Sequence, residues 1–141
     1  MIDVVPLDYS EPTDLEGADE LLHILYPGSS RRFQPDLRSD GVEVFLAKKA
    51  DHQAVGLVVA TFVHDGWEPY GLIDQLVVHP EYRLRGIGRH LVIHACRSLV
   101  EREAVVVFVT TNTAEAERFY RKVGFDSTGP WLARATHSGR R

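Results

Sequence analysis

The stretch Leu72-Ile-Asp-Gln-Leu-Val-Val-His-Pro-Glu-Tyr-Arg-Leu-Arg-Gly-Ile-Gly-Arg-His-Leu91 decides the fold and carries the clearest chemical signal in the sequence. It begins as an apolar strand, breaks at Pro80, passes through a loop rich in arginine and glycine, and opens directly into an amphipathic helix. The first N–H groups of a helix have no partner inside the helix, and the helix dipole adds about half a positive charge there. We therefore expect this turn to bind an anion, with phosphate favoured.

Glycines and arginines strengthen this expected anion site. Gly86 and Gly88 lack the Cβ atoms that would hold a ligand away from the backbone. Arg83, Arg85 and Arg89 place full positive charges around the same turn. The sequence thus predicts a compact cradle for a small anion.

Length and composition predict one globular domain over residues 1–141. The 141 residues are enough for a single core but too few for two, and 44% hydrophobic with 26% charged residues is ordinary for such a domain. The formal net charge of −4 argues against broad attraction to nucleic acid or to an anionic membrane, because either needs a dominant basic face. We expect neither as a partner.

The cysteine content and the N-terminus bear on the compartment. Cys96 is the only cysteine, so no internal disulfide can form, and we interpret it as a buried, inert thiol. The chain begins without a basic segment followed by a long apolar run, and no segment approaches the ~18 apolar residues of a membrane span. These features predict a cytoplasmic protein.

Hydrophobic periodicity and turn residues divide the first half of the chain into strands and one helix. The helix is expected to open with a capping box at Thr13-Asp-Leu-Glu16 and to stop at Tyr26-Pro-Gly28. The polar, basic segment 29–41 is a loop or a short irregular helix, and its position makes it a candidate lid. The expected strands are residues 2–8, 42–48, 53–63 and 71–78, with 42–48 and 53–63 forming an antiparallel hairpin.

The second half reads as alternating helices and strands. We expect a helix over residues 86–102, a strand over 104–109 that is covered on both faces, and a helix over 110–123. Thr111 or Thr113 would cap the start of the last helix and Gly124 its end. One or two short strands around Gly129-Pro130 and a frayed tail over residues 138–141 would follow. The order predicts an α+β fold with a mixed, mostly antiparallel central sheet flanked by helices, and a βαβα second half.

Three features together resemble the Gcn5-related N-acetyltransferase (GNAT) superfamily. Arg83-Leu-Arg-Gly-Ile-Gly88 matches that family's Q/R-x-x-G-x-G/A signature, although Leu84 stands where many members have glycine. A later strand ends in Thr110-Thr-Asn112 and precedes a helix with Phe119-Tyr120 and then Val123-Gly-Phe125. The order of elements is the third feature. The detailed match covers residues 71–125, and it implies a single-domain GNAT-like fold.

The resemblance implies that acetyl-CoA is the co-substrate. Backbone N–H groups of residues 84–89 would hold its pyrophosphate, and the backbone of residues 76–78 would pair with the pantetheine arm and polarise the thioester carbonyl. Asn112 matches a family position that commonly contacts the pantetheine. The expected binding residues are Leu76, Val77, Val78, Arg83, Leu84, Arg85, Gly86, Ile87, Gly88, Arg89 and Asn112.

The resemblance also implies two catalytic residues. Tyr120 matches the family's usual general acid, and a phenol pKa near ~10 is close enough to the ~8.5 of a thiol to protonate the departing sulfur. A helical tyrosine beside Phe119 is also a common core residue. Asp74 is the best candidate for the general base, because it lies on the strand that would present the thioester, although a strand aspartate is often only solvated or paired. His64 and His79 are weaker alternatives.

We therefore expect an N-acetyltransferase that moves an acetyl group to a primary amine of a small molecule or peptide. Transfer would be direct, in a ternary complex, because no suitably placed Cys or Ser indicates an acetyl-enzyme. The sequence does not decide whether the protein forms a homodimer. The main alternative is a non-catalytic acyl-CoA-binding or sensing module.

Two other kinds of site are less well supported. A nucleotide-binding domain of the Rossmann type would need a third glycine where Leu91 stands. His90 and His94 have the spacing of a zinc pair on a helix, but no third ligand is apparent, so we predict no metal.

Overall fold

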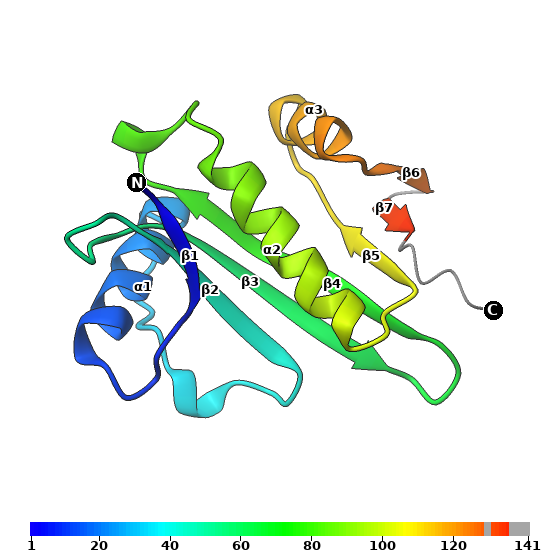
Figure 1. The fold of residues 1–141 in the computed structure, drawn as a ribbon, viewed down its shortest axis with the longest axis horizontal. Coiled ribbons are helices and arrows are strands. Elements are labelled where there is room, and N and C mark those ends of the chain that lie inside the picture. The colour runs from blue at the N-terminus through cyan, green and yellow to red at the C-terminus, as the bar shows by residue number, and fades with distance from the viewer. Residues whose placement is uncertain (129–130, 136–141) are drawn as a thin grey trace.

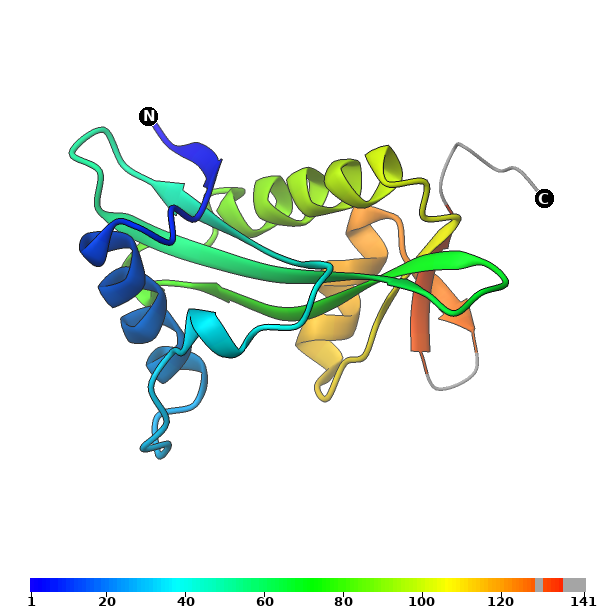
Figure 2. The ribbon, with the colours of Figure 1, turned by 90° about the horizontal axis from the view of Figure 1, so that it is seen from below.

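The computed structural model describes residues 1–128 and 131–135 and contains an open, seven-stranded sheet with helices on both faces (Figures 1 and 2). The strands lie in the order β1-β2-β3-β4-β5-β7-β6. All neighbouring strands are antiparallel except β4 and β5, which run parallel. This arrangement confirms the predicted α+β fold with a mixed, mostly antiparallel sheet.

The elements follow the predicted segments closely. The strands are β1 (Asp3–Pro6), β2 (Val42–Lys48), β3 (Ala54–His64), β4 (Pro69–Val78), β5 (Val106–Val109), β6 (Asp126–Thr128) and β7 (Trp131–Ala135). The helices are α1 (Pro12–Leu25), α2 (Ile87–Glu101) and α3 (Ala114–Val123), with short 3₁₀ turns η1 (Pro35–Leu37) and η2 (Pro80–Tyr82). Gly129-Pro130 and the predicted tail at 138–141 lie outside the described residues. None of the helices in the described ranges is long and apolar enough to cross a membrane.

The core has two parts because the central strands are covered on both faces. Successive strand residues point to opposite faces, so the neighbours Leu57 and Val58 of β3 enter different clusters, and both are fully buried. Val58 packs on the α2 side, with Leu91 and Leu99 of that helix, while Leu57 packs on the α1 side, with Leu21. Figure 2 shows α2 and α1 on opposite sides of the sheet.

The start of α1 differs from the prediction. The helix begins at Pro12 with Glu11 as its N-cap residue, and no side chain caps it, so the predicted capping box was wrong. Proline suits the first helical position because its missing N–H would have no helical partner there. Asp14 turns inward instead: its carboxylate lies 2.6 Å from Lys48 Nζ and accepts the N–H of Asp8 at 2.9 Å.

The strand β5 is less fully covered than its apolar sequence predicted. Val107 and Val109 are buried against the α2 side, whereas Val106 and Phe108 on the other face are only half-buried. The helix on that other face, α1, packs against β3 and β4 rather than β5. Phe108 instead meets the edge of the Tyr70 ring, with centroids 5.8 Å apart.

Candidate active site

The strands β4 and β5 pair only near their starts and then diverge (Figure 1). Their register has two positions, Gly71 with Val107 and Leu72 with Phe108. From Ile73 to Val78, β4 therefore has no paired strand on its β5 side among the described residues. Unpaired strand edges offer main-chain donors and acceptors to an extended ligand. The open edge includes Leu76, Val77 and Val78, the residues expected to meet the pantetheine arm.

A β-bulge places Asp74 on this same stretch of β4. Val59 of β3 pairs with Gln75 and Ala60 pairs with Ile73, which leaves Asp74 as the extra residue. Ile73 packs on the α2 side, whereas Asp74 bonds Thr61 and Gln75 lines a cavity on the α1 side. The side chains of the consecutive residues Asp74 and Gln75 thus both lie on the α1 face, because a bulge changes the direction of side chains locally.

The environment of Asp74 suits a group that accepts a proton. Its side chain is exposed at the strand surface yet partly desolvated, and this desolvation raises the pKa of the carboxyl above its ordinary value. The hydroxyl of Thr61 donates a hydrogen bond to Asp74 Oδ2 at 2.5 Å, which opposes the rise and fixes the orientation of the carboxylate. His64 bonds locally in its own turn, and His79 caps η2 by accepting the N–H of Glu81.

The turn between β4 and α2 has the backbone that the sequence predicted. Gly86 is the N-cap residue of α2 and has φ +82°, in the left-handed region that favours glycine. The first helical hydrogen bond runs from His90 N–H to the Gly86 carbonyl at 3.1 Å, so the N–H groups of Ile87, Gly88 and Arg89 precede it. A Cβ built on Gly86 meets nothing within 4 Å. The turn is therefore open to a ligand.

Gly88 is partly covered by neighbouring elements. A Cβ built on Gly88 would lie 3.4 Å from Phe119 Cζ of α3 and 3.7 Å from Val78 Cγ2 of β4. These are ordinary van der Waals distances, so Gly88 lies where the end of β4, the start of α2 and α3 meet, and the space there would also admit an alanine. The side chain of Ile87 is also buried, so only its backbone is available to a ligand.

Two of the three arginines of the turn have contacts within the protein. Arg83 donates from Nε to the Val78 carbonyl at 3.0 Å, which ties the loop back to the open edge of β4. The Arg85 guanidinium lies 5.1 Å from the centre of the Tyr82 ring. Arg89 is exposed on the first turn of α2, and Leu84 is fully exposed with φ +63°.

Tyr120 lies in the core on the α2 side. Thr113 caps the start of α3 by accepting the N–H of Ala116 at 3.0 Å, and Gly124 ends the helix with φ +110°, as two of the predicted caps required. The Tyr120 ring is 7% exposed and meets the edges of Phe119 and Phe125, at 5.0 and 5.4 Å between centroids. Burial raises the pKa of the Tyr120 phenol well above its ordinary value, so it stays protonated at neutral pH.

The expected site residues fall into two groups on the sheet. The open edge of β4, the turn at residues 84–89 and the core around Tyr120 meet at the contacts of Gly88 with Val78 and Phe119. Asn112 is exposed in the loop that follows β5. Asp74 lies on the opposite, α1 face. The structure thus does not bring Asp74 and Tyr120 together on one face.

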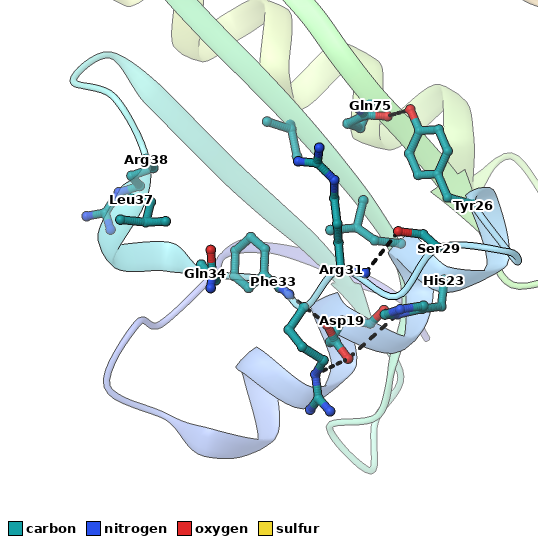
Figure 3. Close-up of a pocket in the computed structure, with 13 residues that line it drawn as sticks. Asp19, His23, Tyr26, Ser29, Arg31, Phe33, Gln34, Leu37, Arg38 and Gln75 are labelled. Carbon is teal, nitrogen blue, oxygen red and sulfur yellow. Dashed lines mark hydrogen bonds and ion pairs between the residues drawn. The ribbon is translucent and has the colours of Figure 1, made fainter.

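A cavity of about 610 Å³ lies on the α1 side, and the sequence did not predict it (Figure 3). It is lined by Asp19, Leu22, His23, Tyr26, Ser29, Arg31, Arg32, Phe33, Gln34, Leu37, Arg38, Val59 and Gln75. Most of these residues belong to α1 and to the segment expected as a lid, and Gln75 follows Asp74 at the bulge. Two signals were available in the sequence: the basic segment 29–41, which was expected as a lid, and the polar pair Asp74-Gln75 inside an otherwise apolar strand.

The two helical histidines do not indicate a metal site. His94 packs against the ring of Phe45, with centroids 5.0 Å apart, and His90 is exposed. Across residues 1–128 and 131–135, no group of three or more His, Cys, Asp or Glu side chains is arranged to hold a metal ion.

Comparison with known proteins identifies the family. The acetyltransferase (GNAT) family matches residues 10–125, which is most of the chain, and the protein belongs to this family. Its co-substrate is acetyl-CoA. The open turn, with the free first N–H groups of α2, and the unpaired edge of β4 fit the phosphates and the amide-bearing arm of that molecule. No significant match is found among curated proteins.

Several solved structures share this fold. The NatC complex bound to Gag peptide and CoA is 17% identical with a TM-score of 0.76, covering 96% of this chain and 98% of that chain. An acetyltransferase from Trypanosoma brucei is 22% identical with a TM-score of 0.77, covering 91% and 94%. An aminoglycoside acetyltransferase from an uncultured soil metagenomic sample, in complex with trehalose, is 18% identical with a TM-score of 0.74, covering 86% of each chain. At such identities these likenesses establish the fold alone.

Proposed function

We propose that this protein is an N-acetyltransferase that moves the acetyl group of acetyl-CoA directly to a primary amine of a small molecule or peptide. The observation that carries the proposal is the open edge of β4 on its β5 side, which has no strand partner from Ile73 onward in the described part of the chain and leads into the first turn of α2. An extended thioester-bearing arm on that edge would have its phosphates at the helix N-terminus. The bound co-substrate supplies the activated acetyl group.

The backbone of this region would do most of the binding. N–H groups of Ile87, Gly88 and Arg89 are free to bind phosphate oxygens, and the exposed Arg89 side chain adds a full charge. A main-chain N–H among residues 76–78 would bond the thioester carbonyl as negative charge develops on it, an effect worth a few kcal/mol. The amide of Asn112 can both donate to and accept from the arm.

Tyr120 would donate the proton that the departing thiolate needs. The raised pKa keeps its phenol protonated, as a general acid must be before the reaction. A thiolate leaving beside this buried phenol would be desolvated too, which raises its own affinity for the proton. The pKa values of the phenol and of the departing thiol would thus stay close to each other, and proton transfer between them would cost little free energy.

Asp74 would take the proton that the acceptor ammonium must lose, directly or through a water molecule. Partial desolvation makes its carboxylate a stronger base than an exposed aspartate, and Thr61 holds it in one orientation. Because Asp74 and Gln75 share the α1 face with the cavity, the acceptor would enter from that side. Amine and thioester would then meet across β4.

The test is thiol release from acetyl-CoA across a broad panel of amines, together with mass analysis of the acetylated product. We expect acceptor-dependent release and an acetyl group on nitrogen. Binding of acetyl-CoA measured by calorimetry, with no release for any amine, would contradict catalysis and favour an acyl-CoA-sensing module. A product acetylated only on oxygen would contradict N-acetylation.

A further inference from the structure

The cavity on the α1 side is lined by more positive than negative charge. Its ionised side chains are the carboxylate of Asp19 and the guanidinium groups of Arg31, Arg32 and Arg38. This imbalance stands out in a protein whose formal net charge is −4. An occupant of the cavity therefore meets a local field opposite in sign to that of the whole chain.

The one carboxylate of the cavity is already engaged by the protein. Asp19 Oδ1 accepts the N–H of Phe33 at 2.7 Å, and Asp19 Oδ2 lies 3.3 Å from Arg32 Nε. His23 Nδ1 is 3.6 Å from the same oxygen. These contacts anchor the segment at residues 31–33 to α1, so Asp19 is committed to holding the loop and is poorly placed to bind an incoming ammonium group.

Arg31 keeps a free guanidinium. Arg38 donates to the Pro35 carbonyl at 2.8 Å and lies 3.7 Å from the centre of the Tyr9 ring, so it is partly engaged. By contrast, no carboxylate of residues 1–128 or 131–135 lies within ion-pair distance of Arg31. Figure 3 shows its side chain reaching away from Asp19 and across the sheet. Its backbone is held by Arg31 N–H donating to Ser29 Oγ at 3.0 Å.

The side of the cavity formed by Tyr26 and Gln75 lies next to Asp74, the proposed base. Tyr26 donates from its hydroxyl to Gln75 Oε1 at 2.6 Å, which joins the end of α1 to the bulge of β4 (Figure 3). Gln75 is the residue next to Asp74. The cavity therefore runs between a free cation at Arg31 and the neighbourhood of a partly desolvated carboxylate at Asp74.

We propose that the acceptor is a primary amine that also carries a carboxylate, which Arg31 binds while the amine lies at Asp74. This inference rests on the proposed acetyltransferase function and names its substrate class. A guanidinium binds a carboxylate through two parallel hydrogen bonds, and apolar side chains such as Leu22 and Phe33 can cover the body between the two groups. Polycationic acceptors would instead face three arginines and be repelled.

The test compares acceptors that differ only in the carboxylate. One arm uses amino acids against their amides, and the other uses C-terminally amidated tetrapeptides with Asp or Asn at the second position. Only the Asp peptide then carries a carboxylate, and the two arms separate a free amino acid from a peptide. In at least one arm we expect kcat/KM about tenfold higher for the carboxylate member, the size of one charge-assisted hydrogen bond. A polyamine should be a poorer acceptor than either member.

Variants of the loop locate the effect. We expect Arg31→Gln to raise KM for the carboxylate acceptor about tenfold with little change in kcat or in KM for its amide, and Arg31→Lys to restore part of the preference. The matched control is Arg97→Gln, which removes one exposed charge from α2 on the other face of the sheet and should leave both acceptors unchanged. Thermal unfolding checks that each variant is folded.

The outcomes separate the two proposals. Equal use of the carboxylate and its amide, a preference for the polyamine, or an equal loss with both acceptors in Arg31→Gln would overturn the inference while acetyl transfer stands. Absence of thiol release with every amine, charged or neutral, would overturn the proposed function and this inference with it.

Discussion

Asp74 owes its position to a single extra residue in β4. Without the bulge, Asp74 would pair across from β3, and the alternation of the strand after it would turn Gln75 away from the α1 face. With the bulge, both polar side chains lie on that face, and Thr61 fixes the carboxylate. The bulge thus brings Gln75 to the same face of the sheet as Asp74.

The proposed base can be tested by Asp74→Asn. This change keeps the size of the side chain and removes its basicity, so we expect kcat to fall about 100-fold while acetyl-CoA affinity stays within about twofold. The parent should lose activity as pH falls, with a midpoint above 3.8, because desolvation raises the pKa of Asp74 and protonation removes the base. A pH–rate profile with the same acid limb in the variant would contradict the role.

Thr61→Val provides the matched control for this assignment. The Thr61 hydroxyl lowers the pKa of Asp74, so its removal should raise that pKa and move the acid limb of the profile to higher pH. Activity at the plateau should fall much less than in Asp74→Asn, because the carboxylate remains and loses only the hydrogen bond that orients it. An acid limb that stays in place would show that it belongs to another group.

The proposed acid can be tested by Tyr120→Phe. The ring remains to pack against Phe119 and Phe125, so we expect nearly unchanged stability and acetyl-CoA binding with kcat lowered about 100-fold. Because burial raises the pKa of Tyr120 above 10.0, the phenol stays protonated and should add no alkaline limb below about pH 10. Unchanged turnover would leave Tyr120 as a core residue alone.

At the scale of elements, the junction of β4 and α2 depends on backbone geometry more than on side chains. Gly86 supplies the positive φ that lets the chain turn into the helix, and Arg83 holds the loop through the Val78 carbonyl. The same turn leaves the first N–H groups of α2 exposed to a ligand. Changing the turn should therefore affect stability and co-substrate binding together.

Gly86→Ala tests this coupling. An alanine at φ +82° costs about 1 kcal/mol of folding free energy, and a shift of the turn should weaken acetyl-CoA binding about tenfold or more. Gly66→Ala is the matched control, because Gly66 also has positive φ, +91°, and open space but lies in the hairpin between β3 and β4. Chemical denaturation and calorimetry should show similar destabilisation in both and weaker binding only in Gly86→Ala. Weaker binding in both would contradict a local effect.

At the scale of the whole molecule, the two faces of the sheet carry different parts of the proposed site. The α2 face and the open edge of β4 hold the features that fit acetyl-CoA, while the α1 face holds Asp74 and the cavity. The second face depends on how α1 is attached to the sheet. Its attachment includes the buried ion pair of Asp14 with Lys48, in which Asp14 is 3% exposed.

Asp14→Asn tests that attachment. Removal of the carboxylate leaves Lys48 without its partner, and we expect a loss of about 2 kcal/mol, less than the 3–5 kcal/mol of a fully buried pair because the Lys48 side chain is 19% exposed. The exposed pair of Lys49 with Asp51 is the control, and Asp51→Asn should cost much less. Urea unfolding measures both. Equal effects in the two variants would show that the buried pair has no special part.

Local signals explain what could be predicted from the sequence. The turn at Gly86, the caps at Thr113 and Gly124, and the hairpin of β2 and β3 each depend on residues close in the chain, so their sequence patterns predict them correctly. The capping box at Thr13 failed although it is local too, because Pro12 begins the helix and Asp14 is drawn to Lys48, 34 residues away. A long-range contact there outweighed the local motif.

The amino-acid sequence alone was enough to predict the order of elements, the glycine turn at the start of α2 and the family, because periodicity, glycine placement and a contiguous motif act over a few residues. Only the tertiary structure decided the divergence of β4 and β5, the face on which Asp74 lies, and the cavity with its free Arg31. These features depend on strand register and on contacts such as Tyr26 with Gln75, which are 49 residues apart. The backbone that we propose binds the co-substrate could thus be predicted from neighbouring residues, whereas the proposed acceptor side depends on segments that only packing brings together.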